Sequence, residues 1–145
     1  MTIALVILVL AIGCVLGFRL WPQAAARKRR EGIRRYSEKH GFEYLDDQVP
    51  QLPLSSSSLK AAQATSNAFT GMGARSRFVF FDCRIREGRT RHTQSVLALE
   101  RLGEHYPACR WDRELREERA GDWTLVYHPR RAWSLNEIDA HVSTL

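Results

Sequence analysis

The sequence predicts an α+β protein in which an N-terminal transmembrane helix precedes a mainly antiparallel sheet domain with a C-terminal amphipathic helix. Three observations predict this order: an apolar run near the N-terminus, alternating apolar side chains in the middle of the chain, and a helix start signal near the C-terminus. The boundaries that follow are a transmembrane anchor at residues 1–21, a basic juxtamembrane helix at residues 22–40 and an α+β domain at residues 41–145.

The apolar run has 16 consecutive apolar or glycine residues, from Ile3 to Phe18. A helix of that length reaches about 24 Å, and the flanking residues extend it toward the hydrocarbon thickness of about 30 Å. Arg19 can extend its guanidinium group to the lipid headgroups, and Trp21 suits the interface. Pro22 is expected to break the helix after the span.

A cleaved signal peptide is the alternative to an anchor, because Ala24-Ala25-Ala26 resembles a small-residue cleavage site. A secretory signal carries positive charge before its apolar segment, whereas only Met1 and Thr2 precede this run. The run is also longer than a usual signal segment, and basic residues crowd in after it. The sequence therefore favours a retained anchor.

Basic residues stand on one side of the apolar run only. No Lys or Arg precedes it, and eight lie within residues 19–39. By the positive-inside rule, we expect a single-pass protein of the inner (plasma) membrane with its N-terminus outside and its domain in the cytoplasm. Topology alone suffices to explain these residues, but seven of them are also candidates for contact with anionic membrane lipid: Arg19, Arg27, Lys28, Arg29, Arg30, Arg34 and Arg35.

The net charge of +6 belongs to the anchor region rather than to the domain. Residues 19–39 hold eight basic and two acidic side chains, which accounts for the whole excess. From His40 onward, 14 basic residues meet 14 acidic residues, so the domain is neutral. Because nucleic-acid binding needs uncompensated basic residues, no nucleic-acid partner is predicted.

The cysteines and histidines lack the spacing of a metal or redox site, since the chain has no C-x-x-C, H-E-x-x-H or H-x-H pattern. A disulfide between Cys83 and Cys109 needs an oxidising compartment, so the expected cytoplasmic location favours free thiols. No metal, cofactor or catalytic residue is assigned from motifs. The histidines are scattered: His40, His92, His105, His128 and His141.

The middle of the chain predicts antiparallel strands. Alternation is strongest from Arg75 to Arg86, where the first half is apolar on both faces and is expected to be buried on both. Glu87-Gly88-Arg89-Thr90 is typical of a hairpin turn into a returning strand at residues 91–100. Weaker patterns predict a short strand at 42–45, followed by a loop at 46–58. The segment at 59–70 is ambiguous between helix and strand, and its end, residues 65–70, leans to strand. A hairpin turn is predicted at 71–73.

The C-terminal third predicts a charged segment, a strand and a helix. Residues 112–122 carry charges of alternating sign and are expected to be solvated, and residues 123–127 predict a strand. A short strand at residues 108–111 is an option. Ser134-Leu135-Asn136-Glu137 is a capping box. The helix that follows is expected to pack on the sheet through one apolar face, made by Leu135, Ile138, Val142 and Leu145.

Three segments carry a resemblance: Asn67-Ala68-Phe69-Thr70-Gly71, Phe80-Phe81-Asp82 and Thr93-Gln94-Ser95-Val96. Together they resemble small bacterial single-pass membrane-anchored proteins with N-x-x-x-G, F-D and T-Q-[ST]-V segments. Family members often carry Tyr after F-D, where this chain has Cys83. The resemblance implies an anchor helix, a sheet and a short terminal helix, and no established catalytic role comes with it.

Two polar groupings stand near the aromatic strand. Asp82 lies close in sequence to Arg84, and a contact with His92 across the hairpin would support acid–base chemistry. A structural ion pair or hydrogen bond between the strands is the favoured interpretation. The hairpin tip carries four arginines that suit either docking to an anionic partner or solubility, and solubility is favoured: Arg84, Arg86, Arg89 and Arg91.

The sequence therefore favours a membrane-tethered cytoplasmic module, non-enzymatic, that binds a protein partner or the membrane surface. The alternative is a small-ligand-binding or enzymatic domain around Asp82 and His92. A deep polar pocket with convergent titratable groups would favour the alternative.

Overall fold

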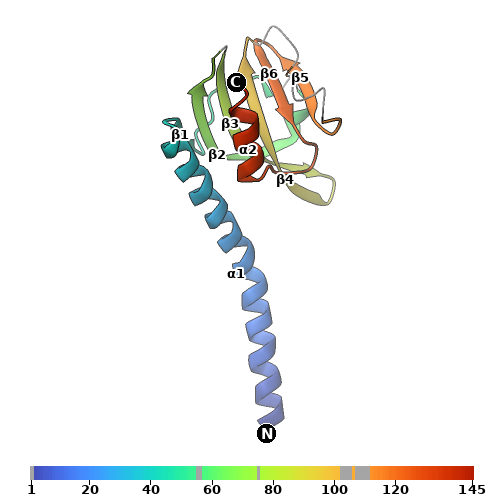
Figure 1. Ribbon diagram of the computed structural model, residues 1–145. Helices are drawn as coiled ribbons and strands as arrows, with labels where there is room; N and C mark the ends of the chain where they lie inside the picture. The colour runs from blue at the N-terminus through green and yellow to red at the C-terminus, as the bar shows by residue number, and fades with distance from the viewer. Residues whose placement is uncertain (1, 55–56, 75, 102–105, 107–111) are drawn as a thin grey trace. The chain divides into compact units, whose positions relative to one another are not determined.

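The computed structural model describes residues 2–54, 57–74, 76–101, 106 and 112–145, with the backbone alone described for residues 2–6 and 8–20. The chain divides into two compact units, Met1–Ile33 and Arg34–Leu145. Secondary structure is α+β, as expected: an N-terminal helix, a six-stranded antiparallel sheet and a C-terminal helix (Figure 1).

The first helix, α1 (Thr2–Lys39), runs without interruption through Pro22. The expected break at Pro22 is therefore wrong. Proline lacks one helical N–H, but its fixed φ is itself helical, and the three alanines that follow favour a helix. Within the described part of the chain, no helix is both long and apolar enough to cross a membrane. Apart from Ile7, the side chains of the apolar run lie outside the described residues.

The sheet has the strand order β1-β2-β3-β4-β6-β5, and every neighbouring pair is antiparallel. The three long central strands follow each other in sequence and are joined by hairpins. The strands are β1 (Glu43–Asp46), β2 (Ala62–Met72), β3 (Arg77–Glu87), β4 (Thr90–Glu100), β5 (Arg116–Ala120) and β6 (Trp123–Tyr127). A short 3₁₀ helix, η2 (Ser58–Ala61), precedes β2, so the ambiguous segment at 59–70 is mostly strand.

One strand lies where none was expected. β5 falls in the charged segment 112–122 and pairs with β6 at the outer end of the sheet. Only Ala120 of this strand is buried, so its charged side chains keep their contact with water. The Gly121-Asp122 turn, with φ +60° at Gly121, was the local signal for a hairpin here. The optional strand at 108–111 lies outside the described residues.

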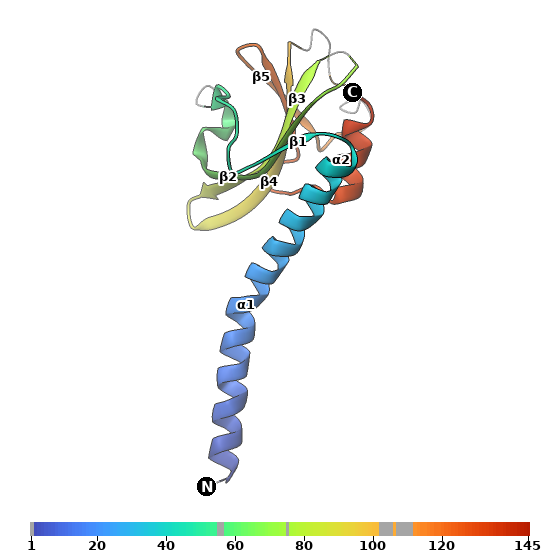
Figure 2. The same ribbon diagram turned by 90° about the vertical axis from the view of Figure 1, so that its left-hand side faces the viewer.

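The two faces of the sheet are covered by different elements (Figure 2). The C-terminal helix, α2 (Leu135–Val142), lies on one face, where Phe69, Phe78, Phe80 and Ile138 are buried. The segment between β1 and β2 packs its apolar residues on the other face, against a second buried cluster: Leu59, Ala68, Val79, Phe81, Cys83, Ile85, Val96, Ala98, Ala120, Leu125 and Tyr127. The predicted burial of both faces of β3 is confirmed.

Gly71 permits the closest packing on the helix-covered face. A Cβ atom at this position would lie 2.6 Å from the Phe42 ring and 2.8 Å from the Phe78 ring. Those two rings meet edge to face, with centroids 5.1 Å apart. Phe42 also stacks on Phe69 at 5.7 Å, so the glycine of the N-x-x-x-G segment is explained by aromatic packing.

The last turn of α1 belongs to the same compact unit as the sheet and contacts α2 there. The Tyr36 hydroxyl donates to Asp139 Oδ1 at 3.2 Å, and His40 Nε2 lies 3.8 Å from the same oxygen. Burial, together with the Asp139 carboxylate, raises the pKa of Tyr36.

The capping box of α2 is confirmed. Ser134 Oγ accepts a hydrogen bond from the backbone N–H of Glu137, and the Ser134 N–H donates to Glu137 Oε2 at 2.8 Å. Arg131 adds an ion pair to Glu137 at 2.7 Å. Partial burial alone would raise the pKa of Glu137, but hydrogen bonds from Ser134 and Arg131 outweigh it and lower the pKa to about 2.

Replacing Ser134 with Ala should lower the free energy of unfolding by about 1 kcal/mol, because the backbone N–H of Glu137 at the helix start loses its hydrogen-bond acceptor. Urea denaturation of the full chain in detergent, followed by tryptophan fluorescence, measures the difference. Ser143→Ala at the exposed end of α2 is the matched control and should change stability by less than about 0.5 kcal/mol. Equal effects of the two variants would contradict the role of the cap.

The charge of Glu137 should make the free energy of unfolding depend on pH. Because the pKa of Glu137 is lowered from 4.5 to about 2, its contribution is complete above pH 4.5 and is lost as the pH falls toward 2. The difference in stability between the parent and Glu137→Gln should therefore shrink over this interval. The same titration of the exposed Glu43→Gln variant is the control, and a pH-independent difference for Glu137→Gln would refute the expectation.

Candidate functional site

The Asp82 carboxylate is fully buried in the middle of β3 and accepts two hydrogen bonds from neighbouring strands. Asn67 Nδ2 on β2 donates to Asp82 Oδ2 at 2.8 Å, and Ser95 Oγ on β4 donates to Asp82 Oδ1 at 2.7 Å. Ser95 Oγ in turn accepts from the backbone N–H of Trp133 at 2.8 Å. This polar network joins three strands to the segment that leads into α2.

A bulge in β2 brings Asn67 to the network. The pairing of β2 with β3 shifts register between Ser66 and Phe69, and Asn67 has φ 56°. Asparagine is one of the few residues with a side chain that adopts this left-handed conformation readily. The bulge therefore uses a residue type suited to it and directs that residue's amide to Asp82.

The contact between Asp82 and His92, which the sequence left open as the less favoured alternative, is not made. Asp82 lies opposite Ser95, whereas His92 lies opposite Ile85. Three residues separate the two positions along the strand, so their side chains leave opposite faces of the sheet. The structure satisfies Asp82 through hydrogen bonds between strands, which is the interpretation the sequence favoured.

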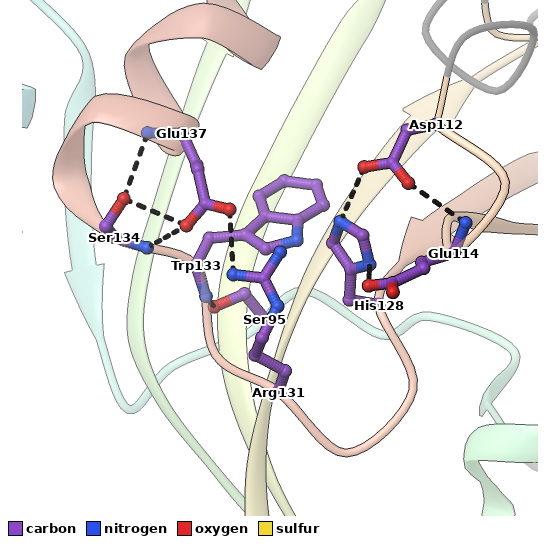
Figure 3. A network of polar contacts seen from close by, with 8 residues as sticks. All are labelled: Ser95, Asp112, Glu114, His128, Arg131, Trp133, Ser134 and Glu137. Atoms are coloured by element: carbon purple, nitrogen blue, oxygen red, sulfur yellow. Dashed lines mark hydrogen bonds and ion pairs between the residues drawn. The ribbon is translucent and has the colours of Figure 1, made fainter.

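A second cluster, which the sequence did not indicate, surrounds the buried His128 just after β6 (Figure 3). Its Nε2 lies 3.0 Å from Asp112 Oδ2, and its Nδ1 lies 3.9 Å from Glu114 Oε2. A carboxylate thus faces each ring nitrogen. The contacts hold the segment before β5 against the end of β6. The alternating charge of residues 112–114 predicts a solvated segment and gives no indication of these contacts.

Trp133 and His141 extend this cluster toward α2. Their ring centroids are 4.3 Å apart, and Trp133 meets His128 edge to face at 6.4 Å. Burial lowers the pKa of His141, and the neighbouring His128 adds to the shift. The Tyr106 hydroxyl lies 3.2 Å from His141 Nδ1. These contacts favour a neutral, packed imidazole over a group that exchanges protons with solvent.

A pocket of about 390 Å³ opens beside His128. Its lining mixes charges and contains no serine, threonine or cysteine: Arg113, Glu114, Arg116, His128, Pro129 and Arg131. Arg131 is engaged by Glu137. A smaller pocket of about 230 Å³ lies at the β5–β6 turn, around Gly121 and Trp123. Asp82 and His92 line neither pocket.

A third polar cluster fastens η2 to the outer strands. Ser58 donates through its N–H to Glu118 Oε1 at 2.8 Å and through its hydroxyl to Glu118 Oε2 at 2.6 Å. Tyr127 contacts both residues through its hydroxyl. Burial and the Glu118 carboxylate raise the pKa of Tyr127. These hydrogen bonds connect η2 to β5 and β6.

Among the described residues, no group of three or more His, Cys, Asp or Glu side chains has the arrangement to hold a metal ion. Cys83 is buried, and desolvation together with the Asp82 charge raises its thiol pKa to about 12. A thiol in this environment is not nucleophilic at neutral pH. Cys109 and His105 lie outside the described residues, so the disulfide question stays as the sequence left it.

The candidate membrane-contact residues all lie on α1. Arg27, Lys28 and Arg30 are exposed, Arg29 is half-buried, and the Arg19 side chain lies outside the described set. Arg34 and Arg35 are exposed in the last turns, where Arg34 pairs with Glu38 at 2.9 Å. All seven candidate residues therefore belong to α1 alone.

Replacing Asp82 with Asn should lower the free energy of unfolding by about 2–3 kcal/mol. The substitution puts an amide group where Asn67 or Ser95 donates, so one buried donor loses its charged acceptor. Urea denaturation measures the loss, and Asp122→Asn on the exposed β5–β6 turn is the control, with an expected change below about 0.5 kcal/mol. A loss no larger than that of the control would mean that the network does not stabilise the sheet.

Comparison with known proteins gives no further assignment. No protein-family model, curated protein or solved structure matches this chain. The resemblance carried by the N-x-x-x-G, F-D and T-Q-[ST]-V segments stays a prediction.

Proposed function

We propose that the chain is a membrane-tethered, non-enzymatic module of the inner membrane, with its N-terminus outside and its α+β domain in the cytoplasm, where it binds the membrane surface or a protein partner. The observation that carries the proposal is the sequence of a single helix: in α1, an apolar run without charge is followed by eight basic residues. This asymmetry is what retains basic segments on the cytoplasmic side.

The spacing of the bases along α1 supports contact with the membrane surface. At 1.5 Å per helical residue, Arg27 follows Phe18 by about 14 Å along the helix, and Arg19 and Trp21 between them suit the interface. Attraction to anionic lipid falls off within a Debye length of about 8 Å, so the bases nearest the apolar run are expected to contribute most to surface binding.

The alternative, a ligand-binding or enzymatic domain around Asp82 and His92, has less support. Asp82 is buried in a network that satisfies its oxygens within the sheet, and His92 leaves the opposite face. The pocket beside His128 is lined by residues of mixed charge and lacks a hydroxyl or thiol nucleophile. Nucleic acid is not a proposed partner, because the domain is neutral.

Fusion of a reporter after Leu145 tests the orientation. A reporter active only in the cytoplasm should be active and a periplasm-only reporter inactive; the reverse pattern would overturn the proposal. Replacing Arg27, Lys28, Arg29 and Arg30 with Gln should give mixed orientation, because the charge difference across the span is reduced. Replacing Arg101, Arg113, Arg116 and Arg119, which are far from the span in the sequence, with Gln removes the same number of charges and should leave orientation unchanged.

The choice between lipid and protein contact is tested by purification of the full chain from membranes in mild detergent after cross-linking. A protein partner should be recovered with the parent and remain with the Arg27–Arg30 variant. Recovery of lipid alone, lost in that variant, would assign the membrane surface as the ligand.

A further inference from the structure

We propose that the tip of the β3–β4 hairpin is a second contact with the anionic membrane surface, which docks the sheet on the bilayer that holds the tether. The inference rests on the proposed tether. The tip is defined by Arg84, Arg86, Arg89 and Arg91, all of which are exposed.

The strand register places like charges together. Arg86 lies directly opposite Arg91, an arrangement that is unfavourable across a sheet unless an anion lies between the two groups. Arg84 is two residues from Arg86 on the same strand and therefore leaves the same face. Three guanidinium groups thus share one face at the end of the hairpin.

The neighbouring acid does not neutralise them. Glu87 is engaged by Arg130, whose Nε and guanidinium nitrogen both lie 3.1 Å from Glu87 Oε2. Within the described part of the chain, Arg84, Arg89 and Arg91 have no ion-pair partner. Gly88 has φ 60° at the first position of the two-residue turn, which places Arg89 at the extreme end. The tip is therefore a concentrated positive patch on a domain whose remaining residues from His40 onward are net acidic, with 10 basic and 14 acidic side chains.

The composition of the tip favours phosphate headgroups over a protein surface. Residues 86–91 contain no apolar side chain, whereas the centre of a protein interface is apolar and aromatic. Guanidinium groups bind phosphate through two parallel hydrogen bonds, and a row of them on a flat strand pair suits a layer of headgroups. A duplex nucleic acid would require a wider basic face than the net acidic remainder of the domain supplies.

Hydrogen–deuterium exchange of the full chain in lipid nanodiscs tests the proposal. Discs of phosphatidylcholine alone are compared with discs that also contain phosphatidylserine. Exchange of the peptide covering residues 84–91 should be at least fivefold slower in the anionic discs, and 1 M salt should remove the difference, since it shortens the Debye length to about 3 Å. The peptide covering the β5–β6 hairpin should exchange equally in both.

Two triple variants separate the hairpin from general charge. Arg84→Gln/Arg86→Gln/Arg91→Gln should lose the lipid-dependent protection, because each arginine near the surface adds to the attraction to anionic lipid. Arg113→Gln/Arg116→Gln/Arg119→Gln, with the same change in net charge, should keep it. A variant whose β5–β6 peptide exchanges as in the parent has retained its fold, so loss of protection in that variant reports the contact itself.

Equal exchange of the hairpin in the two kinds of disc would overturn the proposal, as would protection that survives the hairpin substitutions. Protection by polyglutamate in neutral discs, without protection by anionic lipid, would also overturn it and assign the tip to an acidic protein. Each of these outcomes is independent of the orientation measured by the reporters, so failure of the tether and failure of the hairpin contact are distinguishable.

Discussion

The Asp82 carboxylate is held inside the sheet by hydrogen bonds, and this constraint connects the other parts of the fold. A charge removed from water is costly unless the protein replaces the lost hydrogen bonds. Here a bulged Asn67 and the hydroxyl of Ser95 replace them. Ser95 also accepts from the backbone of Trp133. The same group of atoms therefore fixes the central register and the point from which α2 begins.

The resemblance segments have structural explanations in this network and its surroundings. Asn67 and Ser95 are the donors to Asp82, and Gly71 leaves room for the contact of Phe42 with Phe78. The three segments, far apart in sequence, thus meet on one face of the sheet. In this chain their side chains serve hydrogen bonding and close packing.

The elements that were predictable are those with a strong local pattern. Alternation identified β3, β4 and β6, and Ser134 with Glu137 identified the start of α2. The charged residues of β5 predicted a solvated segment and not a strand. An outermost strand can nevertheless carry charged side chains, because these can stay in contact with water. Pro22 was overestimated as a helix breaker, since the penalty of one missing hydrogen bond is smaller than that of ending a long helix.

The site was less predictable because it depends on register and on contacts between distant segments. The two-residue turn at Gly88-Arg89 was enough to fix the register of β3 against β4. Because the turn places Glu87 opposite Thr90, Asp82 lies opposite Ser95 and not opposite His92. The His128 cluster had no such local signal. Asp112 reaches the ring only after β5 and β6 have paired, and that pairing was not expected from a charged segment.

The composition of β5 has a consequence for many copies of this protein side by side. An outer strand presents unpaired backbone groups that can recruit the same strand of a neighbour, and confinement of a chain to a surface raises the frequency of such encounters. Four of the five residues of Arg116–Ala120 are charged. Arg116 and Arg119 are exposed among them, and charged side chains of this kind on an outer strand disfavour the pairing of one sheet with another.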